Sequence, residues 1–144
     1  MEIIQLNTVT ESQALEIHDL SNQLGYENDP QLLFKRLKQI VSLKDHAVFV
    51  AQLDSQIVGW LHCLVCIRIE SPVFVEVAGL VVDEHARGQQ IGKKLIEASK
   101  HWGRCQHISI MRIRCNVVRT ESHQFYQALG FISNKAQKVF EMLL

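Results

Sequence analysis

The amino-acid sequence predicts an α/β fold in which helices cover a mixed, mostly antiparallel β-sheet. Segments with the apolar spacing of amphipathic helices alternate with apolar, β-branched segments that have the length of strands. Three of the strand-like segments follow one another directly, as in an antiparallel meander, and helices separate the others. No repeat, low-complexity segment or evident linker interrupts the 144 residues, so we expect residues 1–144 to form one domain.

The first part of the chain is expected to contain one strand and two helices. Ile3–Leu6 is short and apolar enough for a first strand. Thr10 starts a capping box, in which its hydroxyl and the side chain of Gln13 satisfy free backbone donors, and the helix that begins there ends at Gly25. Asp29, followed by a proline, predicts a second helix, because a carboxylate caps the first turn and proline fits its first position.

The middle of the chain predicts the three-strand meander. Ala47–Leu53 and Ile57–Ile69 are rich in apolar and β-branched residues and are separated by a polar turn, which is typical of a hairpin. Val73–Val82 is nearly unbroken apolar sequence, interrupted by Glu76 and Gly79, as in a strand that is buried on both faces. We therefore expect Val73–Val82 to be the central strand.

The last part of the chain predicts a helix, a strand, a second helix and a terminal strand pair. An apolar stripe at helical spacing places the first helix from about Gly88 to about His101. The alternation of Ser109–Cys115 predicts a strand. Arg119–Leu129 has one apolar helical face and stops at Gly130, and the apolar segment Val139–Leu144 is expected to be an edge strand.

Composition argues against several classes of function. The chain has 15 basic and 15 acidic residues, so it lacks the net charge that attracts nucleic acid or an anionic membrane. No stretch approaches the roughly 20 apolar residues of a membrane span, and no basic leader precedes an apolar run, so we expect a cytoplasmic protein. Cys63 and Cys66 lie three residues apart on a predicted strand and point to opposite faces, and no second pair stands at zinc spacing. We expect reduced thiols and no metal.

The turn after Val82 has the features of an anion-binding site. An apolar strand ends there and an amphipathic helix follows, and the first backbone N–H groups of a helix have no internal acceptor. These groups and the helix dipole attract phosphate, which glycines at 88 and 92 allow to approach the main chain. The residues of this segment are Arg87, Gly88, Gln89, Gln90, Ile91, Gly92 and Lys93.

Two other phosphate-binding motifs do not fit this segment. The nucleotide P-loop needs four residues between its first glycine and its Gly-Lys pair, whereas three stand between Gly88 and Gly92. Lys94 also occupies the place of the P-loop hydroxyl. The dinucleotide fingerprint G-x-G-x-x-G is absent from the segment.

The segment resembles the acyl-CoA-binding motif of the GNAT superfamily of N-acyltransferases, Q/R-x-x-G-x-G/A. Arg87 and Gly92 match, whereas Gln90 stands where the family usually has glycine and Glu84 where a proline is common. We expect Gln90 to be compatible with the helix and still to offer its backbone N–H. A second block, residues 116–131, resembles the family's N-x-x-R and F-Y-x-x-x-G-F region in spacing and order. The resemblance implies a sheet with splayed central strands, flanked by about four helices.

The resemblance also implies acetyl-CoA as cosubstrate. Main-chain groups of Leu80, Val81 and Val82 would pair with the pantetheine arm, and the amides from Arg87 to Lys93 would hold the pyrophosphate. The Asn116 side chain would hydrogen-bond the pantetheine where the two central strands separate, unless it only caps a helix or turn.

Two residues are candidates for proton transfer. Tyr126 matches the family tyrosine four residues before Gly130, so it would protonate the departing CoA thiolate; otherwise it packs on its helix with its hydroxyl in water. Glu76 is one of few charges in the central strand, where desolvation would favour its use as a base through water. Alternatively, Glu76 lies on an exposed face or pairs with Arg112 or Arg114.

These features predict an N-acetyltransferase that transfers acetyl from acetyl-CoA to a primary amine of a small molecule or peptide, by direct attack in a ternary complex. The alternative is an acyl-CoA-binding regulatory or interaction module that has lost catalysis. We expect the first two helices and the loop around Gly25–Glu27 to select the acceptor, where Glu27 and Asp29 either attract a cationic amine or only cap and solvate the loop. An exposed edge at Val139–Leu144 would favour a homodimer by strand pairing.

Overall fold

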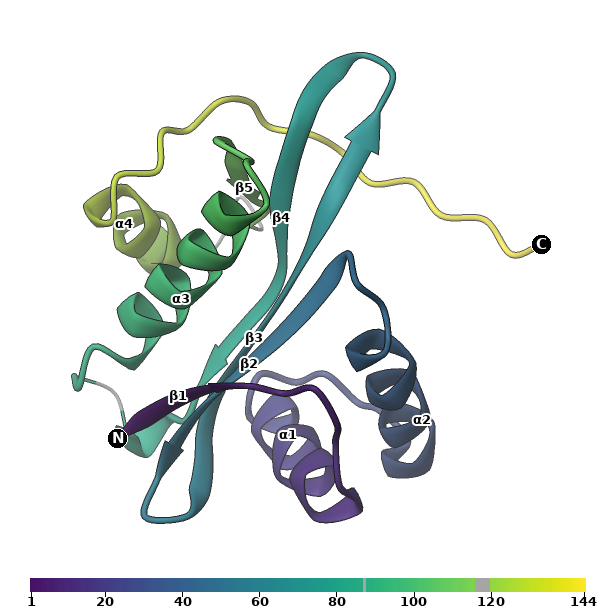
Figure 1. The fold of residues 1–144 in the computed structure, drawn as a ribbon, viewed down its shortest axis with the longest axis vertical. Helices are drawn as coiled ribbons and strands as arrows, with labels where there is room; N and C mark the ends of the chain where they lie inside the picture. The colour runs from purple at the N-terminus through teal and green to yellow at the C-terminus, as the bar shows by residue number, and fades with distance from the viewer. Residues whose placement is uncertain (87, 116–119) are drawn as a thin grey trace. The chain divides into compact units, whose positions relative to one another are not determined.

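The computed structural model describes residues 1–86, 88–115 and 120–144, which form two compact units, Met1–Ile113 and Arg114–Leu144 (Figure 1). In chain order the first unit contains β1 (Glu2–Gln5), α1 (Glu11–Gln23), α2 (Pro30–Val41), β2 (His46–Leu53), β3 (Gln56–Arg68), β4 (Ser71–Val82), the 3₁₀ helix η1 (Glu84–Ala86), α3 (Ile91–Cys105) and β5 (Met111–Ile113). The second unit contains α4 (Thr120–Ala128). Whether both units make one domain stays a prediction.

One five-stranded sheet forms the centre of the first unit. Its strand order is β1-β2-β3-β4-β5, and each neighbouring pair is antiparallel except β4 and β5, which are parallel. The long strands β2, β3 and β4 are the predicted meander, and β4 lies between β3 and β5. The prediction of a mixed, mostly antiparallel sheet is confirmed.

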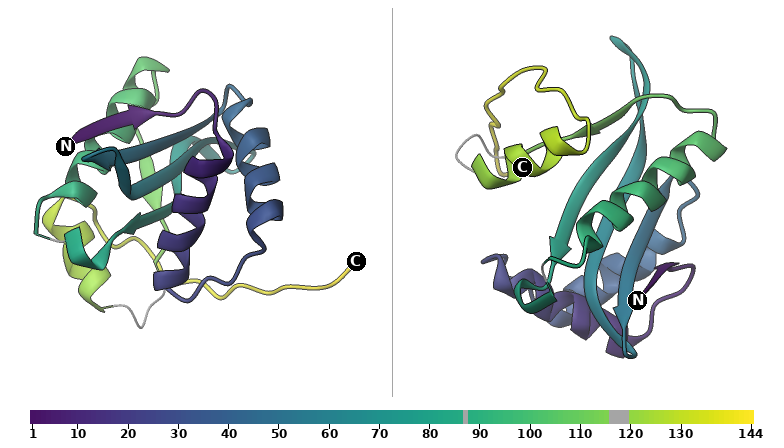
Figure 2. Two further views of the ribbon diagram at one scale, coloured as in Figure 1. Left: turned by 90° about the horizontal axis from the view of Figure 1, so that it is seen from below. Right: turned by 90° about the vertical axis from the view of Figure 1, so that its left-hand side faces the viewer.

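Helices cover both faces of this sheet (Figure 1, Figure 2). On one face, buried residues of α1 and α2 form a core with Val48, Val50, Ile57 and Val81 of the sheet. On the other face α3 lies so close that a Cβ on Gly59 would come within 3.1 Å of Ile91. Burial of apolar side chains on both faces explains why the three central strands have near-continuous apolar sequences.

The predicted helix starts in the first unit are confirmed. The Thr10 hydroxyl accepts a hydrogen bond from the Gln13 backbone N–H, and the Gln13 side chain accepts one from the Thr10 N–H, which completes the capping box of α1. Asp29 Oδ1 accepts hydrogen bonds from the N–H groups of Gln31 and Leu32 and caps α2. These short-range bonds fix the start of each helix at the position that the sequence predicts.

Two predicted elements of the first unit differ from the structure. Helix α3 begins at Ile91 and ends at Cys105, instead of running from Gly88 to His101, because Gly88 and Gln90 both have positive φ, 87° and 59°, which a right-handed helix excludes. The strand expected at Ser109–Cys115 pairs only over Met111–Ile113.

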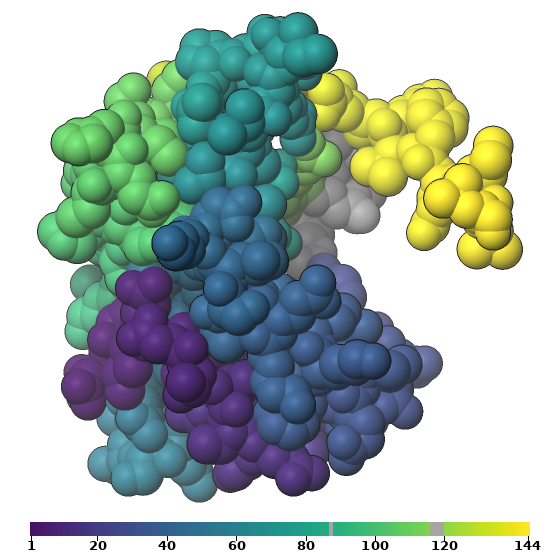
Figure 3. All heavy atoms as spheres, turned by 45° about the vertical axis from the view of Figure 1, so that its right-hand side comes forward, coloured from purple at the N-terminus to yellow at the C-terminus, as the bar shows by residue number. Residues whose placement is uncertain are grey.

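The second unit consists of α4 and the C-terminal segment that follows it. Gly130, with φ of 99°, ends the helix: its N–H bonds the Gln127 carbonyl, and the Phe131 N–H bonds the Tyr126 carbonyl. The expected strand at Val139–Leu144 is wrong, because residues 129–144 have no regular secondary structure. The large apolar side chains that are exposed in this segment, the yellow end of the chain in Figure 3, are Ile132, Val139, Phe140, Met142, Leu143 and Leu144. An apolar sequence alone does not make a strand when no partner strand supplies its hydrogen bonds.

Candidate active site

The turn from η1 into α3 presents backbone N–H groups at a helix N-terminus. Gln90 is the N-cap of α3 and its side chain makes no capping hydrogen bond, whereas the Gln90 carbonyl accepts from the Lys94 N–H as the first bond of the helix. The amides of residues 91–93 precede that bond and have no acceptor within the helix. The Lys93 side chain is exposed beside them. Arg87 lies outside the described residues. The turn therefore has the geometry that binds a phosphate group.

The conformation of Gln90 corrects one prediction and shows why the GNAT motif usually has glycine at this position. Gln90 has φ of 59° and ψ of 26°, which is left-handed and incompatible with the helix that was expected to include it. This conformation suits glycine, the residue that the motif usually has there. Gly88 shares the positive φ, and a Cβ built on it would meet nothing within 4 Å. At this turn glycine is favoured by backbone geometry more than by lack of space.

Strand β4 continues past its partner β5. The described β4–β5 pairs run from Val75 to Val77, whereas the pairing of β4 with β3 continues to Val82. Between those two stretches β4 has a bulge: Cys63 pairs with Val77 and His62 with Gly79, so the exposed Ala78 is the additional residue. A bulge increases the twist of a strand and turns it away from its neighbour.

The main chain of β4 beyond the bulge includes Leu80, Val81 and Val82, the predicted pantetheine-binding residues. Leu80 and Val82 are half-buried, and Val81 is buried in the core beneath α1 and α2. The side chains are thus used for packing, and any cofactor contact here would fall to backbone N–H and C=O groups.

Glu76 lies on β4 in a half-buried position. Its Oε2 is 3.9 Å from Cys66 Sγ on β3, and in the parallel register Glu76 stands opposite Arg112 of β5. The Arg112 guanidinium lies 4.2 Å from the centre of the Phe74 ring. The arginine neighbour that the sequence suggested is therefore present in the sheet register, together with a thiol and an aromatic ring.

A histidine pair beside β4 was not foreseen from the sequence. His46 Nδ1 and His62 Nε2 are 2.9 Å apart, so one nitrogen donates its proton to the other. Burial, followed by the charge of His46, lowers the pKa of His62 to about 4. His62 stands directly opposite Gly79 on β4. The predicted hairpin would have been the signal, because it places these two positions on neighbouring strands, where His46 pairs with Leu64 and His62 with Val48.

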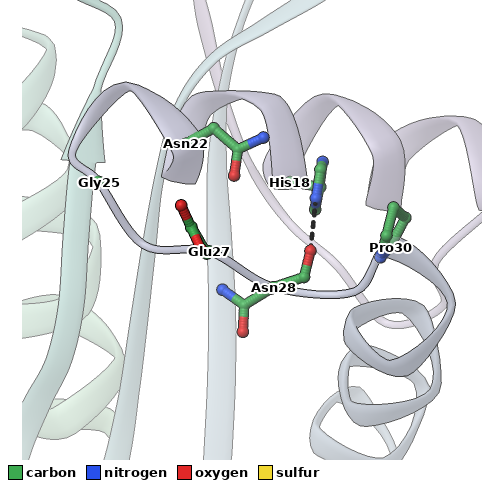
Figure 4. Close-up of a pocket in the computed structure, with 6 residues that line it drawn as sticks. All are labelled: His18, Asn22, Gly25, Glu27, Asn28 and Pro30. Carbon is green, nitrogen blue, oxygen red and sulfur yellow. Dashed lines mark hydrogen bonds between the residues drawn. The ribbon is translucent and has the colours of Figure 1, made fainter.

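A cavity of about 490 Å³ opens between the end of α1 and the α1–α2 loop, residues 24–29 (Figure 4). It is lined by His18, Asn22, Gly25, Glu27, Asn28 and Pro30. His18 Nε2 lies 2.8 Å from the Asn28 carbonyl oxygen, and Arg36 Nη2 of α2 donates to Asn28 Oδ1 over 2.8 Å. Both helices therefore hold the loop at one residue, and Glu27 places an exposed carboxylate at the cavity.

The remaining predicted site residues belong to the second unit. The Tyr126 ring lies edge-on to Phe125 and Phe131, with centroid distances of 5.2 Å and 5.8 Å. Tyr126 is half-buried. Asn116 lies outside the described residues. Within its own unit, Tyr126 is thus held by an aromatic cluster at the C-terminal end of α4.

The described residues contain neither a metal-binding cluster nor a membrane-spanning helix. No group of three or more His, Cys, Asp or Glu side chains there is arranged to hold a metal ion. Within the same residues no helix has both the length and the apolar character needed to cross a membrane. Within the described residues the cysteines at 63, 66, 105 and 115 are not joined in disulfides.

The family model of GNAT acetyltransferases matches residues 14–131, which include the α3 turn, β4 and α4. The chain belongs to the GNAT acetyltransferase family. Among curated proteins none matches the sequence significantly.

Solved structures of two aminoglycoside acetyltransferases and of one further protein share the fold of this chain. The aminoglycoside N-acetyltransferase AAC(6')-Iy in complex with CoA has a TM-score of 0.85 at 21% identity, over 98% of this chain and 93% of that chain. The aminoglycoside 6'-N-acetyltransferase AAC(6')-IG from Acinetobacter haemolyticus has a TM-score of 0.85 at 17% identity, over 100% and 99% of the two chains. A tetramutant of the BH1408 protein from Bacillus halodurans has a TM-score of 0.83 at 19% identity, over 99% and 100%. These likenesses confirm the predicted fold class.

Proposed function

We propose that this chain is an acetyl-CoA-dependent N-acetyltransferase that acts on a primary amine by direct attack in a ternary complex. The observation that carries the proposal is the pair of backbone features in the first unit: the N-terminus of α3, which has no side-chain cap, and the stretch of β4 beyond its last described pair with β5. Membership of the GNAT acetyltransferase family supports the same reaction. The alternative of a non-catalytic acyl-CoA-binding module is not favoured, because the family and the structural neighbours are acetyltransferases.

In this proposal the main chain binds the cofactor. Amides from Gly88 to Lys93 bind the pyrophosphate at the positive end of the α3 dipole, with Arg87 and Lys93 adding charge. Main-chain groups of residues 80–82 pair with the pantetheine arm as an additional strand would. Asn116 hydrogen-bonds the same arm. A backbone N–H near Val82 would stabilise the oxyanion that forms at the thioester carbonyl.

The chemistry requires a neutral amine and a proton for the leaving thiolate. The amine nitrogen attacks the thioester carbonyl, the C–S bond breaks, and the electron pair of that bond leaves with the CoA sulfur. Tyr126 would give its phenolic proton to that sulfur, and Glu76 would accept the amine proton through water. No metal is needed for this sequence of steps.

The acceptor is proposed to enter beside the α1–α2 loop. Glu27 supplies a carboxylate and Asn22 and Asn28 supply amide groups around the loop cavity, which suits a cationic amine rich in hydroxyl and amino groups. Related folds have been solved with CoA-S-monomethyl-acetylneamine and with sisomicin, so aminoglycosides form the first panel of acceptors to test. Peptide and polyamine substrates form the second and third panels.

Replacement of Tyr126 by phenylalanine tests the proposal. The variant keeps the ring that packs against Phe125 and Phe131 and removes only the hydroxyl. We expect its affinity for acetyl-CoA, measured by calorimetry, to remain within about twofold, while kcat falls by roughly 10²-fold or more. Gln127→Ala, at an exposed position of the same helix, is the control and should match the wild type. Full turnover by the phenylalanine variant would remove Tyr126 from the mechanism, and binding without amine-dependent thiol release on any panel would favour the non-catalytic alternative.

A further inference from the structure

His18 of α1 connects the helix to the α1–α2 loop through both of its ring nitrogens. Nε2 lies 2.8 Å from the Asn28 carbonyl oxygen in the loop, and Nδ1 lies 3.2 Å from Asp19 Oδ1 (Figure 4 shows the first of these bonds). The side chain is largely covered, with 12% of its surface exposed. Both partners are oxygen atoms that only accept hydrogen bonds when Asp19 is ionised.

This geometry fits the protonated ring. An imidazolium donates from both nitrogens, whereas a neutral imidazole has one N–H and one lone pair. A neutral His18 would therefore point a lone pair at either the Asn28 carbonyl or the Asp19 carboxylate. The hydrogen bond to Asp19 and then the bond to the Asn28 carbonyl raise the pKa of His18 above its ordinary value of 6.5, against a smaller opposing effect of burial.

The charged groups around His18 come from three elements. Asp19 lies beside it on α1, and Asp29 at the start of α2 adds a favourable charge. Glu27 lines the same cavity from the loop. On α2, Arg36 is hydrogen-bonded to the Asn28 side chain. These three carboxylates outnumber the one arginine, so the surroundings favour a positive charge on His18.

The loop has few other attachments between the two helices. At its start the Gly25 N–H bonds the Asn22 carbonyl and the Tyr26 N–H bonds the Ser21 carbonyl, which ends α1. At its other end Asp29 caps α2. Tyr26 and Glu27, both exposed, lie between that turn and the fixed residue Asn28. The bonds from His18 to the Asn28 carbonyl and from Arg36 to the Asn28 side chain are thus the contacts next to Glu27 that position its carboxylate.

We propose that protonated His18 is a positioning residue for the acceptor site, which holds the α1–α2 loop through Asn28 and loosens it on losing its proton. The assignment of this loop to the acceptor rests on the proposed function. The attachment of the loop by protonated His18 follows from the contacts of His18 with Asp19 and Asn28 and does not depend on the proposed function. This attachment is complete below pH 6.5 and is lost as the pH rises through the pKa that His18 has in the folded protein.

Hydrogen exchange tests the attachment of the loop by His18 without a measurement of enzyme activity. The exchange rates of the backbone amides in residues 24–29 are measured between pH 5.5 and 9 and corrected for the intrinsic rate at each pH. In the wild type we expect exchange to become roughly 5- to 10-fold faster across the titration of His18, because a charge-assisted hydrogen bond is replaced by a weaker one. His18→Gln, which donates one neutral bond, should show no such step. His101→Gln, at an exposed histidine of α3, is the matched control and should keep it.

A second variant distinguishes a proton-dependent attachment of the loop from a purely structural role of the His18 side chain. Asp19→Asn keeps the size of the side chain and removes the carboxylate that favours the charged ring, so the exchange step should move to lower pH and remain present. Proton NMR of His18 should report the same midpoint. A step that is absent in the wild type, persists in His18→Gln, or does not move in Asp19→Asn would overturn the proposal.

The link to the acceptor has its own readout. The amine itself titrates, so its KM in the wild type is divided by its KM in His18→Gln at each pH. This ratio should rise roughly 3- to 10-fold across the titration of His18. The KM for acetyl-CoA should stay constant. An equal change in both KM values would overturn the assignment of the loop to the acceptor. Failure to acetylate any amine would count against the proposed function, whereas the exchange measurements would still decide the role of His18.

Discussion

Replacement of Gln90 by glycine is expected to stabilise the protein. Gln90 has φ of 59° and ψ of 26°, and its side chain makes no capping hydrogen bond that the substitution would remove. The left-handed conformation costs a residue with a Cβ roughly 1–2 kcal/mol. Glycine avoids that cost but loses about 0.5–1 kcal/mol in chain entropy. The balance is a gain of about 0–1.5 kcal/mol in the free energy of unfolding, centred on about 0.7 kcal/mol.

Gln89→Gly provides the matched control, because it makes the same chemical change one residue earlier. Gln89 is exposed like Gln90 but is not among the described residues with positive φ. Glycine at 89 should therefore cost about 0.5–1 kcal/mol. The two variants are expected to differ by about 1–2 kcal/mol in urea-induced unfolding followed by circular dichroism.

The cofactor site gives this experiment a second measurement. Both variants keep every backbone N–H of the turn, so the affinity for acetyl-CoA should change by less than about threefold in Gln90→Gly. Equal destabilisation by the two glycines would refute the assigned backbone conformation of Gln90. A large loss of affinity in Gln90→Gly alone would show that the side chain takes part in binding, contrary to the proposed main-chain recognition.

Two further predictions concern the sheet beside the site. Gly79→Ala should cost about 1–3 kcal/mol in the free energy of unfolding, because its Cβ would lie 2.8 Å from the Trp60 ring. This cost should be smaller in a Trp60→Leu background. The same cost in both backgrounds would contradict this packing. Unfolding free energy should also fall as the pH is lowered from about 6.5 to about 4, because burial and the charge of His46 lower the pKa of His62 to about 4 and the unfolded chain binds the proton first. The loss should be about 2 kcal/mol after allowance for solvent near the ring, and His62→Gln should remove it, so an unchanged slope in that variant would contradict the assignment.

Local sequence signals predicted the framework of the first unit well. The capping box at Thr10 and the capped proline turn at Asp29 act over three residues, and both helices begin where these signals place them. The three long strands are apolar along their length because both faces of the sheet are covered. Such features depend on neighbours in the sequence or on burial alone, so a single sequence specifies them.

The features that the sequence did not reveal depend on contacts between distant residues or on the path of the backbone. His18 meets Asn28 only because the turn at Gly25 reverses the chain and brings residues ten apart together. Gln90 is left-handed because of the path from η1 into α3, although glutamine itself favours a helix. The segment Val139–Leu144 has strand-like residues without a partner strand. Propensity gives no information about any of these three.

The fold of this chain persists at low sequence identity, and the proposed cofactor site, which uses main-chain groups, would tolerate similar changes of side chain. The neighbours with TM-scores of 0.85 share 17% and 21% of residues with this chain. A helix N-terminus and a bulged strand recognise a cofactor through N–H and C=O groups, which every residue except proline supplies. The choice of residue at such positions is then limited mainly by side-chain packing and by the backbone conformation that the position requires, as the positive φ at Gln90 illustrates. The α1–α2 loop would be different, because in the proposals Glu27 acts through its carboxylate and His18 through its ring, which bonds the Asn28 carbonyl. Acceptor preference should therefore change with substitutions in this loop while acetyl-CoA affinity does not, and the His18 variants measure whether that separation holds.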